Sequence, residues 1–260
     1  MIGENARRVF QTALLLLGTL ALSSCGGGEV PGTSNSLQVG GPGRLADWVG
    51  VIGTGQSLSV GAAAGTPIST TQPFNNLKLH DDGPPPQYPL DGSGDLSLIP
   101  LTERFRPPLE GWPPDGQYPN NIQGESPNAG TANEITQLWS DRMGTDYVTI
   151  HSVVGWSGHC LRDIDKSNPT TRAYPGGLSE ARTFKRMAGE AKKSFAYGAV
   201  ILTHGECDAN NAGYEAGLHQ LWLDYNQDLG EITGQTRDIP LLISQQSTIV
   251  TQSGGSAVAV

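Results

Sequence analysis

Short apolar stretches recur along the chain and predict the strands of a sheet. Four of them are rich in β-branched residues, and each spans only a few positions. They are Trp48–Ile52, Tyr147–Val154, Ala199–Thr203 and Ile239–Ser244. Continuous apolar runs of this length are typical of strands that are buried on both faces of a parallel sheet.

Helical patterns lie between these runs. They cover residues 131–144, 179–193 and 214–229, where apolar side chains repeat at helical spacing. The first begins with a predicted capping box, Thr131 with Glu134, and stops at Gly144. Strands that alternate with helices predict an α/β fold over residues 44–260, a three-layer α/β/α sandwich with a mostly parallel sheet. Functional sites in such folds form at the carboxyl ends of the strands.

Residues 82–127 interrupt this alternation of strands and helices. They hold eleven of the 18 prolines and show little periodicity, so we expect a long functional insertion or an irregular lid. The aromatic residues of this segment are Tyr88, Phe105, Trp112 and Tyr118. Two roles are open for them: stacking on sugar rings, or pinning the loop to the core.

The amino terminus has the pattern of an export signal. Two arginines precede an apolar run at residues 12–22, which is shorter than the roughly 20 apolar residues that a membrane span needs. The following Leu-Ser-Ser-Cys resembles a bacterial lipobox, which predicts a signal peptide over residues 1–24 and lipidation of Cys25. An ordinary secretory signal is the alternative. Residues 25–43 are rich in Gly, Ser and Pro and predict a flexible tether. We therefore expect an exported bacterial lipoprotein, held to a membrane at the cell envelope by its lipid.

Charge and composition narrow the choice of partners. The formal net charge is −9 at pH 7, so the chain would repel phosphate backbones, and nucleic acid is not an expected partner. The five histidines and the two cysteines beyond Cys25 lack the spacing of metal ligands. Neither a metal nor another cofactor is predicted.

The first predicted strand runs into a glycine-rich turn, Gly53-Thr54-Gly55-Gln56-Ser57. Such a turn begins either a dinucleotide-binding loop or a site with a nucleophilic serine. A dinucleotide fingerprint needs a small residue where Leu58 stands, and an acidic residue that closes a second strand. Asp81 and Asp82 lie at the right distance, but the residues before them make a poor strand. The serine interpretation is therefore favoured.

A second motif supports the serine interpretation. The segment His204-Gly205-Glu206-Cys207-Asp208 follows another predicted strand. Together with Gly55-Gln56-Ser57 it resembles the SGNH/GDSL hydrolase superfamily, in the branch of sialate O-acetylesterase-like and acetylxylan-esterase-like enzymes. Residues 123–126, Gln-Gly-Glu-Ser, match the second motif better by letter, but no predicted strand precedes them. The resemblance implies a flavodoxin-like SGNH hydrolase fold and a serine esterase that works without a cofactor.

The resemblance also assigns roles to single residues. Ser57 is the expected nucleophile, with Ser59 as the nearest competitor and helix capping as the alternative role for Ser57. Gly155, in the motif Val-Val-Gly-Trp-Ser-Gly, is expected to donate a second backbone N–H to the oxyanion, beside the N–H of Ser57 itself. His204 stands where the family has glutamine, and it is the expected third donor.

Five further residues complete the expected site. Gln56, Glu206 and Asp208 are expected at the substrate, the two acids by shaping their loop through backbone hydrogen bonds. Cys160 and Cys207 fall in loops that follow two predicted strands, so a disulfide between them would brace the site. Two free buried thiols are the alternative.

The resemblance is incomplete at one point. The family takes its general base from a late Asp-x-x-His motif, and no histidine of this chain follows an aspartate at that spacing. We expect that the chain is truncated before this motif and lacks the C-terminal part of the fold. A substitute histidine, such as His204, and an inactive relative are the alternatives.

The expected function is that of a serine esterase, which removes acyl groups, above all acetyl, from carbohydrate esters at the cell envelope. A catalytically inactive, glycan-binding surface lipoprotein is the main alternative. A dinucleotide-dependent enzyme is the third.

Overall fold

The computed structural model describes residues 43–62, 64, 66–81, 89–103, 116–168 and 171–244. By its contacts the chain divides into two units, Met1–Leu45 and Ala46–Val260, and nearly all described residues belong to the second. The expected signal peptide, Cys25 and the tether up to residue 42 lie outside the described residues, as do Tyr88, Phe105 and Trp112. None of the described helices combines the length and the apolar composition needed to cross a membrane.

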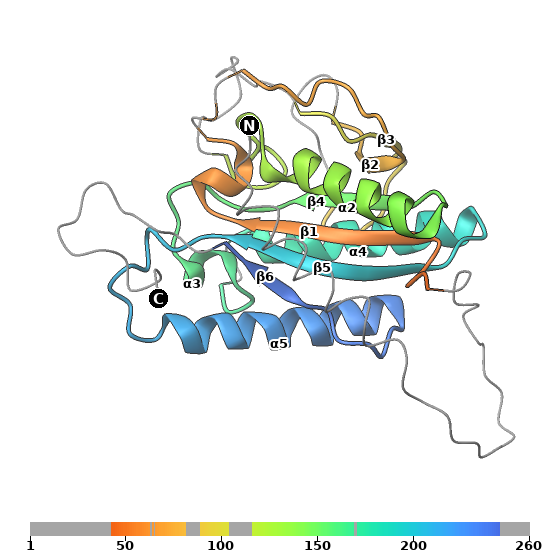
Figure 1. Ribbon diagram of the computed structural model, residues 1–260. Helices are drawn as coiled ribbons and strands as arrows, with labels where there is room; N and C mark the ends of the chain where they lie inside the picture. Colours follow the sequence, from red (N-terminus) through yellow and green to blue (C-terminus); the bar gives the residue numbers. More distant parts are fainter. Residues whose placement is uncertain are drawn as a thin grey trace, which may run out of the picture. The chain divides into compact units, whose positions relative to one another are not determined.

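The second unit is built on a six-stranded sheet with the strand order β3-β2-β4-β1-β5-β6 (Figure 1). The strands are β1 (Trp48–Gly55), β2 (Asn76–Leu79), β3 (Leu98–Pro100), β4 (Val148–Val153), β5 (Phe195–Thr203) and β6 (Leu241–Ile243). β3 runs antiparallel to β2, and every other neighbouring pair is parallel. The predicted α/β class and mostly parallel sheet are confirmed, and the arrangement is consistent with a flavodoxin-like fold.

All four predicted strands are present, with ends that differ by a few residues, but β2 and β3 are additional. The expectation of a poor strand before Asp81 is wrong, because Leu77 pairs with Ile150 of β4 and Lys78 pairs with Ile99 of β3. Lys78 is nearly buried, and its ammonium group donates to the Asp81 carboxylate at 3.0 Å. β2 is only four residues long and holds two leucines, so its apolar pattern is too short to predict a strand from the sequence.

Four helices and one 3-10 turn accompany the sheet in the described part of the chain. They are η1 (Ser57–Val60), α2 (Pro127–Met143), α3 (Leu161–Ile164), α4 (Ala173–Glu190) and α5 (Tyr214–Thr233). Helix α2 begins at Pro127, and Ser126 is its N-cap, with a side chain that accepts a backbone hydrogen bond from the first turn. The predicted capping box of Thr131 with Glu134 is therefore wrong. The predicted stop at Gly144 is confirmed, since this residue has a left-handed φ of 61°.

Successive residues of β1 contact different helices. A Cβ on Gly53 would come within 2.5 Å of the Asn128 side chain, so only glycine lets α2 approach this closely. The neighbouring Ile52 lies instead near Gly177 of α4. This packing leaves the carboxyl ends of β1, β4 and β5 side by side at one edge of the sheet, at the left in Figure 1.

Candidate functional site

The turn after β1 is held against the end of β5. The backbone N–H of Gln56 donates to the Thr203 carbonyl at 3.0 Å. Gly55 has a φ of 134°, and a Cβ at this position would collide with the same carbonyl. Glycine is therefore required here on both conformational and steric grounds. The turn places Ser57 at the first position of η1, where β1, β4 and β5 end.

The two serines of the turn have different environments. Ser59 is 2% exposed, and its hydroxyl donates to the Gln56 carbonyl at 2.6 Å. Ser57 is partly exposed, and its hydroxyl has no hydrogen-bond partner among the residues that the structure describes. The N-cap of η1 is Gln56, so Ser57 does not cap this turn. A nucleophile must be reachable, and the geometry therefore favours Ser57 over Ser59.

Gly155 lies directly against this turn. The N–H of Trp156 donates to the Gly55 carbonyl at 2.9 Å. A Cβ on Gly155 would collide with the Ser59 hydroxyl and with the backbone of Gly55. The structure thus brings the two glycine-containing segments together, and neither glycine has room for a side chain.

His204 is fully buried, and both of its ring nitrogens have partners. Nε2 donates to the carbonyl of His159 at 3.2 Å, because a carbonyl can only accept, and Nδ1 lies 3.0 Å from the Tyr214 hydroxyl oxygen. Burial lowers the pKa of this ring, which favours the neutral imidazole, and in that form Nδ1 accepts from the Tyr214 hydroxyl. The N–H that was expected to act as the third oxyanion donor is therefore engaged with the loop that holds His159.

The other three expected substrate residues have distinct contacts. The Gln56 side chain accepts a 3.3 Å hydrogen bond from the N–H of Cys207, and Asp208 accepts a 2.7 Å bond from the N–H of Leu161. Glu206 is partly buried, and its Oε2 has no partner among the described residues. Gln56 and Asp208 therefore organise the loops, while Glu206 retains an unused acceptor.

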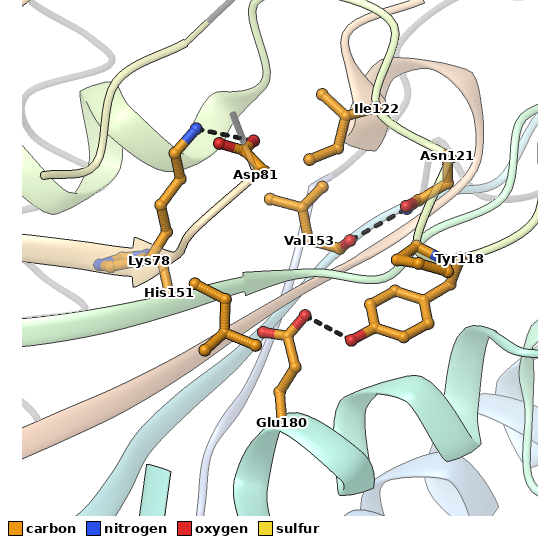
Figure 2. Close-up of a pocket in the computed structure, with 10 residues that line it drawn as sticks. Lys78, Asp81, Tyr118, Asn121, Ile122, His151, Val153 and Glu180 are labelled. Atoms are coloured by element: carbon orange, nitrogen blue, oxygen red, sulfur yellow. Dashed lines mark hydrogen bonds and ion pairs between the residues drawn. The ribbon is translucent and has the colours of Figure 1, made fainter. Parts of the chain in front are cut away.

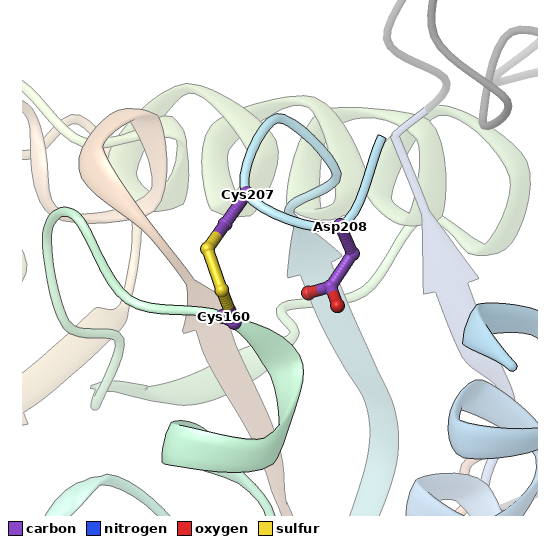
Figure 3. Close-up of side chains that lie close together, drawn as sticks. All are labelled: Cys160, Cys207 and Asp208. Atoms are coloured by element: carbon purple, nitrogen blue, oxygen red, sulfur yellow. A yellow bond between two sulfur atoms is a disulfide. The ribbon is translucent and has the colours of Figure 1, made fainter. Parts of the chain in front are cut away.

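A disulfide joins Cys160 and Cys207 (Figure 3). It links residues that are 47 positions apart in the chain, and it ties the loop after β4 to the loop after β5. The hydrogen bonds of His204 and Asp208 connect the same two loops. The Asp208 carboxylate lies within 4.8 Å of both sulfurs, but sulfurs that are bonded to each other offer no thiolate to a metal ion.

His159, which was not singled out from the sequence, belongs to the same loops. Its side chain is 31% exposed, and its Nδ1 lies 3.5 Å from Oδ2 of Asp163. The ring stacks on Trp156 with a centroid separation of 3.4 Å, and Nε2 has no partner in the described part of the chain. The pair escaped sequence reasoning because its order, His-x-x-x-Asp, differs from the expected Asp-x-x-His.

The remaining histidines lie elsewhere in the fold. His80 follows β2, and His219 is on α5 next to Trp222. His151 is 1% exposed within β4, and burial lowers its pKa to about 3, so the ring stays neutral. None of these three lies on the loops around Ser57.

A second polar region surrounds a cavity of about 30 Å³ (Figure 2). Its lining includes Lys78 of β2, Asp81 after that strand, His151 of β4, Glu180 of α4 and Tyr118. The Tyr118 hydroxyl donates to Glu180 at 2.8 Å, and burial raises the pKa of Glu180 to about 7. The charged groups here are bonded to other protein groups, whereas the hydroxyl of Ser57 is reachable. The candidate reactive site is therefore the sheet edge.

No known protein family matches the chain, and no curated protein matches it. Two solved structures show a weak likeness. NanS aligns with a TM-score of 0.49 and 13% identity, over 78% of this chain and 68% of that chain. A protein from Arabidopsis thaliana aligns with a TM-score of 0.47 and 11% identity, over 79% of this chain and 89% of that chain. Likenesses at this level do not bear on the activity of the chain.

Proposed function

We propose that the chain is a serine hydrolase that removes acyl groups, above all acetyl, from carbohydrate esters. One observation carries the proposal: the partly exposed Ser57, whose hydroxyl has no hydrogen-bond partner among the described residues, stands on a turn that is packed against Gly155, where no side chain fits. The resemblance of residues 55–57 and 204–208 to SGNH/GDSL hydrolases supports the same reaction. It also supports the three-layer α/β/α sandwich of that superfamily.

The reaction would proceed in two steps. Ser57 Oγ attacks the acyl carbon while its proton passes to a base, and the ester C–O bond breaks as the sugar alcohol takes up a proton. The charge that develops on the acyl oxygen needs preorganised N–H donors, for which the backbones of Ser57 and Gly155 are the candidates. Water then attacks the acyl-enzyme, which releases a carboxylic acid and restores the serine hydroxyl.

We propose that His159 is the base that accepts the proton of Ser57. The Asp163 carboxylate is near Nδ1, which leaves Nε2 for the serine, and this is the order that an acid-oriented base requires. The distance of 3.5 Å is long for a hydrogen bond, but such distances often shorten when substrate binds. Cys160, the residue after His159, forms the disulfide with Cys207, and the N–H of Cys207 donates to the side chain of Gln56, the residue before Ser57. These contacts connect the loop of His159 to the turn that carries Ser57.

The substrate class and the location rest on the sequence. The family resemblance supports a carbohydrate ester, and the lipobox at Cys25 supports a lipid-anchored protein at the cell envelope. A surface lipoprotein that binds glycans without cleaving them is the second candidate. The occupied ring nitrogens of His204 favour that second candidate, since they leave the expected third donor without a free N–H.

A fluorophosphonate probe, which reacts with activated serines, separates the two candidates. We expect mass spectrometry of the labelled full chain to find the adduct on Ser57. Labelling should vanish in Ser57→Ala and persist in Ser59→Ala. A wild-type chain that stays unlabelled contradicts the hydrolase and favours the glycan-binding protein.

A further inference from the structure

The segment Tyr118–Glu125, here called the strap, crosses from helix α4 to the turn that carries Ser57. It belongs to the proline-rich region that the sequence marked as an insertion. The strap has no regular secondary structure, so each of its fixed points depends on individual contacts. It is anchored at both ends and at its middle, and the middle contact reaches the candidate site.

The first end of the strap is anchored on α4. Tyr118 is 2% exposed, and its hydroxyl donates to Glu180 at 2.8 Å. Its ring lies so close to Gly176 that a Cβ there would be 2.5 Å from a ring carbon. The tyrosine therefore docks in a place that only a glycine-bearing helix face provides.

The other end of the strap is anchored on η1 and the loop that follows it. The N–H of Gln123 donates to the carbonyl of Val60 at 2.8 Å. The Glu125 carboxylate accepts from the N–H groups of Ile68 and Ser69 at 3.0 and 3.2 Å. The strap therefore contacts the element that begins with Ser57.

The middle of the strap is anchored by Asn121, which is 1% exposed. Its Nδ2 donates to the carbonyl of Gly155 at 2.8 Å and to the carbonyl of Val153 at 2.9 Å, and Figure 2 shows the second bond. Both hydrogens of the amide group are thus donated to the carbonyls of the two residues that flank Val154. A single side chain clamps the strand end that carries Gly155.

The short length of β2 explains why this clamp is needed. In the described part of the chain, β2 pairs with β4 only through Asn76 and Leu77, so β4 continues beyond its strand partner. Its last carbonyls on that side would be buried without donors, which is costly. Asn121 supplies the donors that a longer strand would have provided.

On the strap side, this strand end is not fully packed. The cavity of about 30 Å³ lies between the strap and β4, and Asn121, Ile122 and Val153 line it (Figure 2). On the β1 side, Gly155 is in contact with the turn of Ser57. Backbone bonds from the N–H groups of Val154 and Trp156 to β1 hold Gly155 on that side, and the two Asn121 hydrogen bonds hold it on the other side.

We infer that Asn121 is a positioning residue for the proposed hydrolase, because it fixes the Gly155 peptide against the turn that carries Ser57. This inference rests on the proposed function. An oxyanion donor stabilises the transition state only when it is held in place before the reaction, and a displacement of about 1 Å can cost roughly 100-fold in rate. Asn121 touches neither the serine nor the substrate, so its effect passes through Gly155.

The test compares Asn121→Asp with Asn120→Asp in the full chain. The first substitution removes both donors with almost no change of shape. The second introduces the same charge at the preceding strap residue and leaves both bonds intact. We expect Asn121→Asp to slow fluorophosphonate labelling of Ser57 by about 10- to 100-fold relative to Asn120→Asp. With 4-nitrophenyl acetate, the loss should fall on kcat rather than on KM.

A structural readout accompanies the rates. Hydrogen exchange of the peptide that spans residues 150–156 should accelerate in Asn121→Asp and not in Asn120→Asp. If the buried aspartate prevents folding, Asn121→Ser serves instead, because it stays neutral and lacks the amide group; its labelling should be slower than that of the wild type.

The possible failures are distinguishable. Equal labelling rates for the two aspartate variants, with the wild type labelled on Ser57, overturn the inference and leave the proposed function standing. A wild-type chain that is not labelled overturns the proposed function, and the positioning role falls with it. Slow labelling of Asn121→Asp with unchanged exchange at residues 150–156 also overturns the inference, since Gly155 was then not displaced.

Discussion

The sheet edge around Ser57 differs from the second polar region, here called the cluster, which consists of the cavity-lining residues Lys78, Asp81, Tyr118, His151 and Glu180. The two regions hold similar chemical groups, but those of the cluster are buried and those of the edge are partly exposed. In the cluster, burial raises the pKa of Glu180 to about 7 and lowers that of His151 to about 3. At the edge, Ser57 and His159 are partly exposed and retain unpartnered atoms in the described part of the chain. Shifted pKa values often mark reactive sites, but here they follow burial, both in Glu180, which anchors the strap through Tyr118, and in His151. Accessibility, not burial, identifies the candidate nucleophile.

This contrast divides the expected effects of substitutions. Changes in the cluster should alter the stability of the fold and its dependence on pH. Changes at the edge should alter the reactivity of Ser57. The disulfide lies at the edge but closes a long loop, so we expect it to be an exception to this division and to act on stability.

Removal of the disulfide by the double substitution Cys160→Ser and Cys207→Ser should have the largest effect on stability. The closed loop spans 47 residues, for which the loop-entropy relation gives a loss of about 4 kcal/mol in the free energy of unfolding. Urea unfolding without reductant measures this loss, and the wild type in reductant is the matched control.

Labelling of Ser57 should change by less than about twofold in the same variant, because the bonds of Asp208 and His204 still join the two loops. A variant that keeps its stability, or one that loses labelling while still folded, would show that the disulfide serves the site rather than the fold.

The second effect concerns Glu180 and pH. Its pKa is raised from 4.5 to about 7 by burial, so the folded chain favours the protonated acid. The stability that this provides is fully present below about pH 4.5 and is lost as pH rises through 7, a change on the order of 3 kcal/mol. Glu180→Gln should therefore flatten the fall in unfolding free energy between pH 5 and 8.

The matched control is Glu190→Gln, since Glu190 is exposed on the same helix. His151 acts in the opposite direction. Its lowered pKa gives stability that is present above about pH 6.5 and is lost as pH falls toward 3, and this acid limb should persist in Glu180→Gln. Parallel pH profiles for wild type and Glu180→Gln would show that the carboxyl does not titrate in this range.

The parts of the fold that could be predicted from the sequence are those with an apolar period. β1, β4 and β5 are buried runs, β6 is a short apolar run, and α4 and α5 have regular apolar faces, so simple patterns located them. β2 carries a buried lysine, and the N-cap of α2 is Ser126, in a stretch with no periodicity. Polar contacts fix these elements, and such contacts leave little trace in a single sequence.

The same limit applies to the site. The neighbouring positions of Ser57, Gly155 and the loop 204–208 follow from parallel strands, whose carboxyl ends share one edge. Asn121 and the pair His159 with Asp163 come from irregular segments, whose paths are set by side-chain hydrogen bonds and a disulfide. No spacing rule relates residue 121 to residue 155. Only the structure shows that they meet.

Replacement of His159 should give the third effect. If His159 accepts the serine proton, His159→Ala should slow labelling of Ser57 by roughly 100-fold, which corresponds to about 2.7 kcal/mol. Added imidazole should restore part of the rate, because the missing base can enter the space left by the ring. His219→Ala, on helix α5, is the control and should label normally. An unchanged rate in His159→Ala would exclude this residue as the base.

The smallest loss of unfolding free energy is expected for Tyr118→Phe, and the pH dependence of this loss reports on the ionisation of Glu180. The tyrosine hydroxyl donates to Glu180, and this bond lowers the pKa of the carboxyl in partial opposition to burial. A hydrogen bond to a neutral acid contributes about 1 kcal/mol, whereas one to a charged group contributes about 1.5–3 kcal/mol. The loss of unfolding free energy in Tyr118→Phe should therefore grow as pH rises from 5 to 8.

A double-mutant cycle with Glu180→Gln isolates this term, since a glutamine acceptor cannot ionise. In the Glu180→Gln background, the penalty for Tyr118→Phe should stay near 1 kcal/mol at every pH. A penalty that grows with pH in both backgrounds would assign the titration to another group of the cluster. Because Tyr118 anchors the strap and Asn121 lies three residues further along it, the same cycle tests the link between the two regions. If Glu180 ionisation loosens the strap, exchange at residues 150–156 should accelerate with pH in the wild type, after correction for the intrinsic rate, and not in Glu180→Gln.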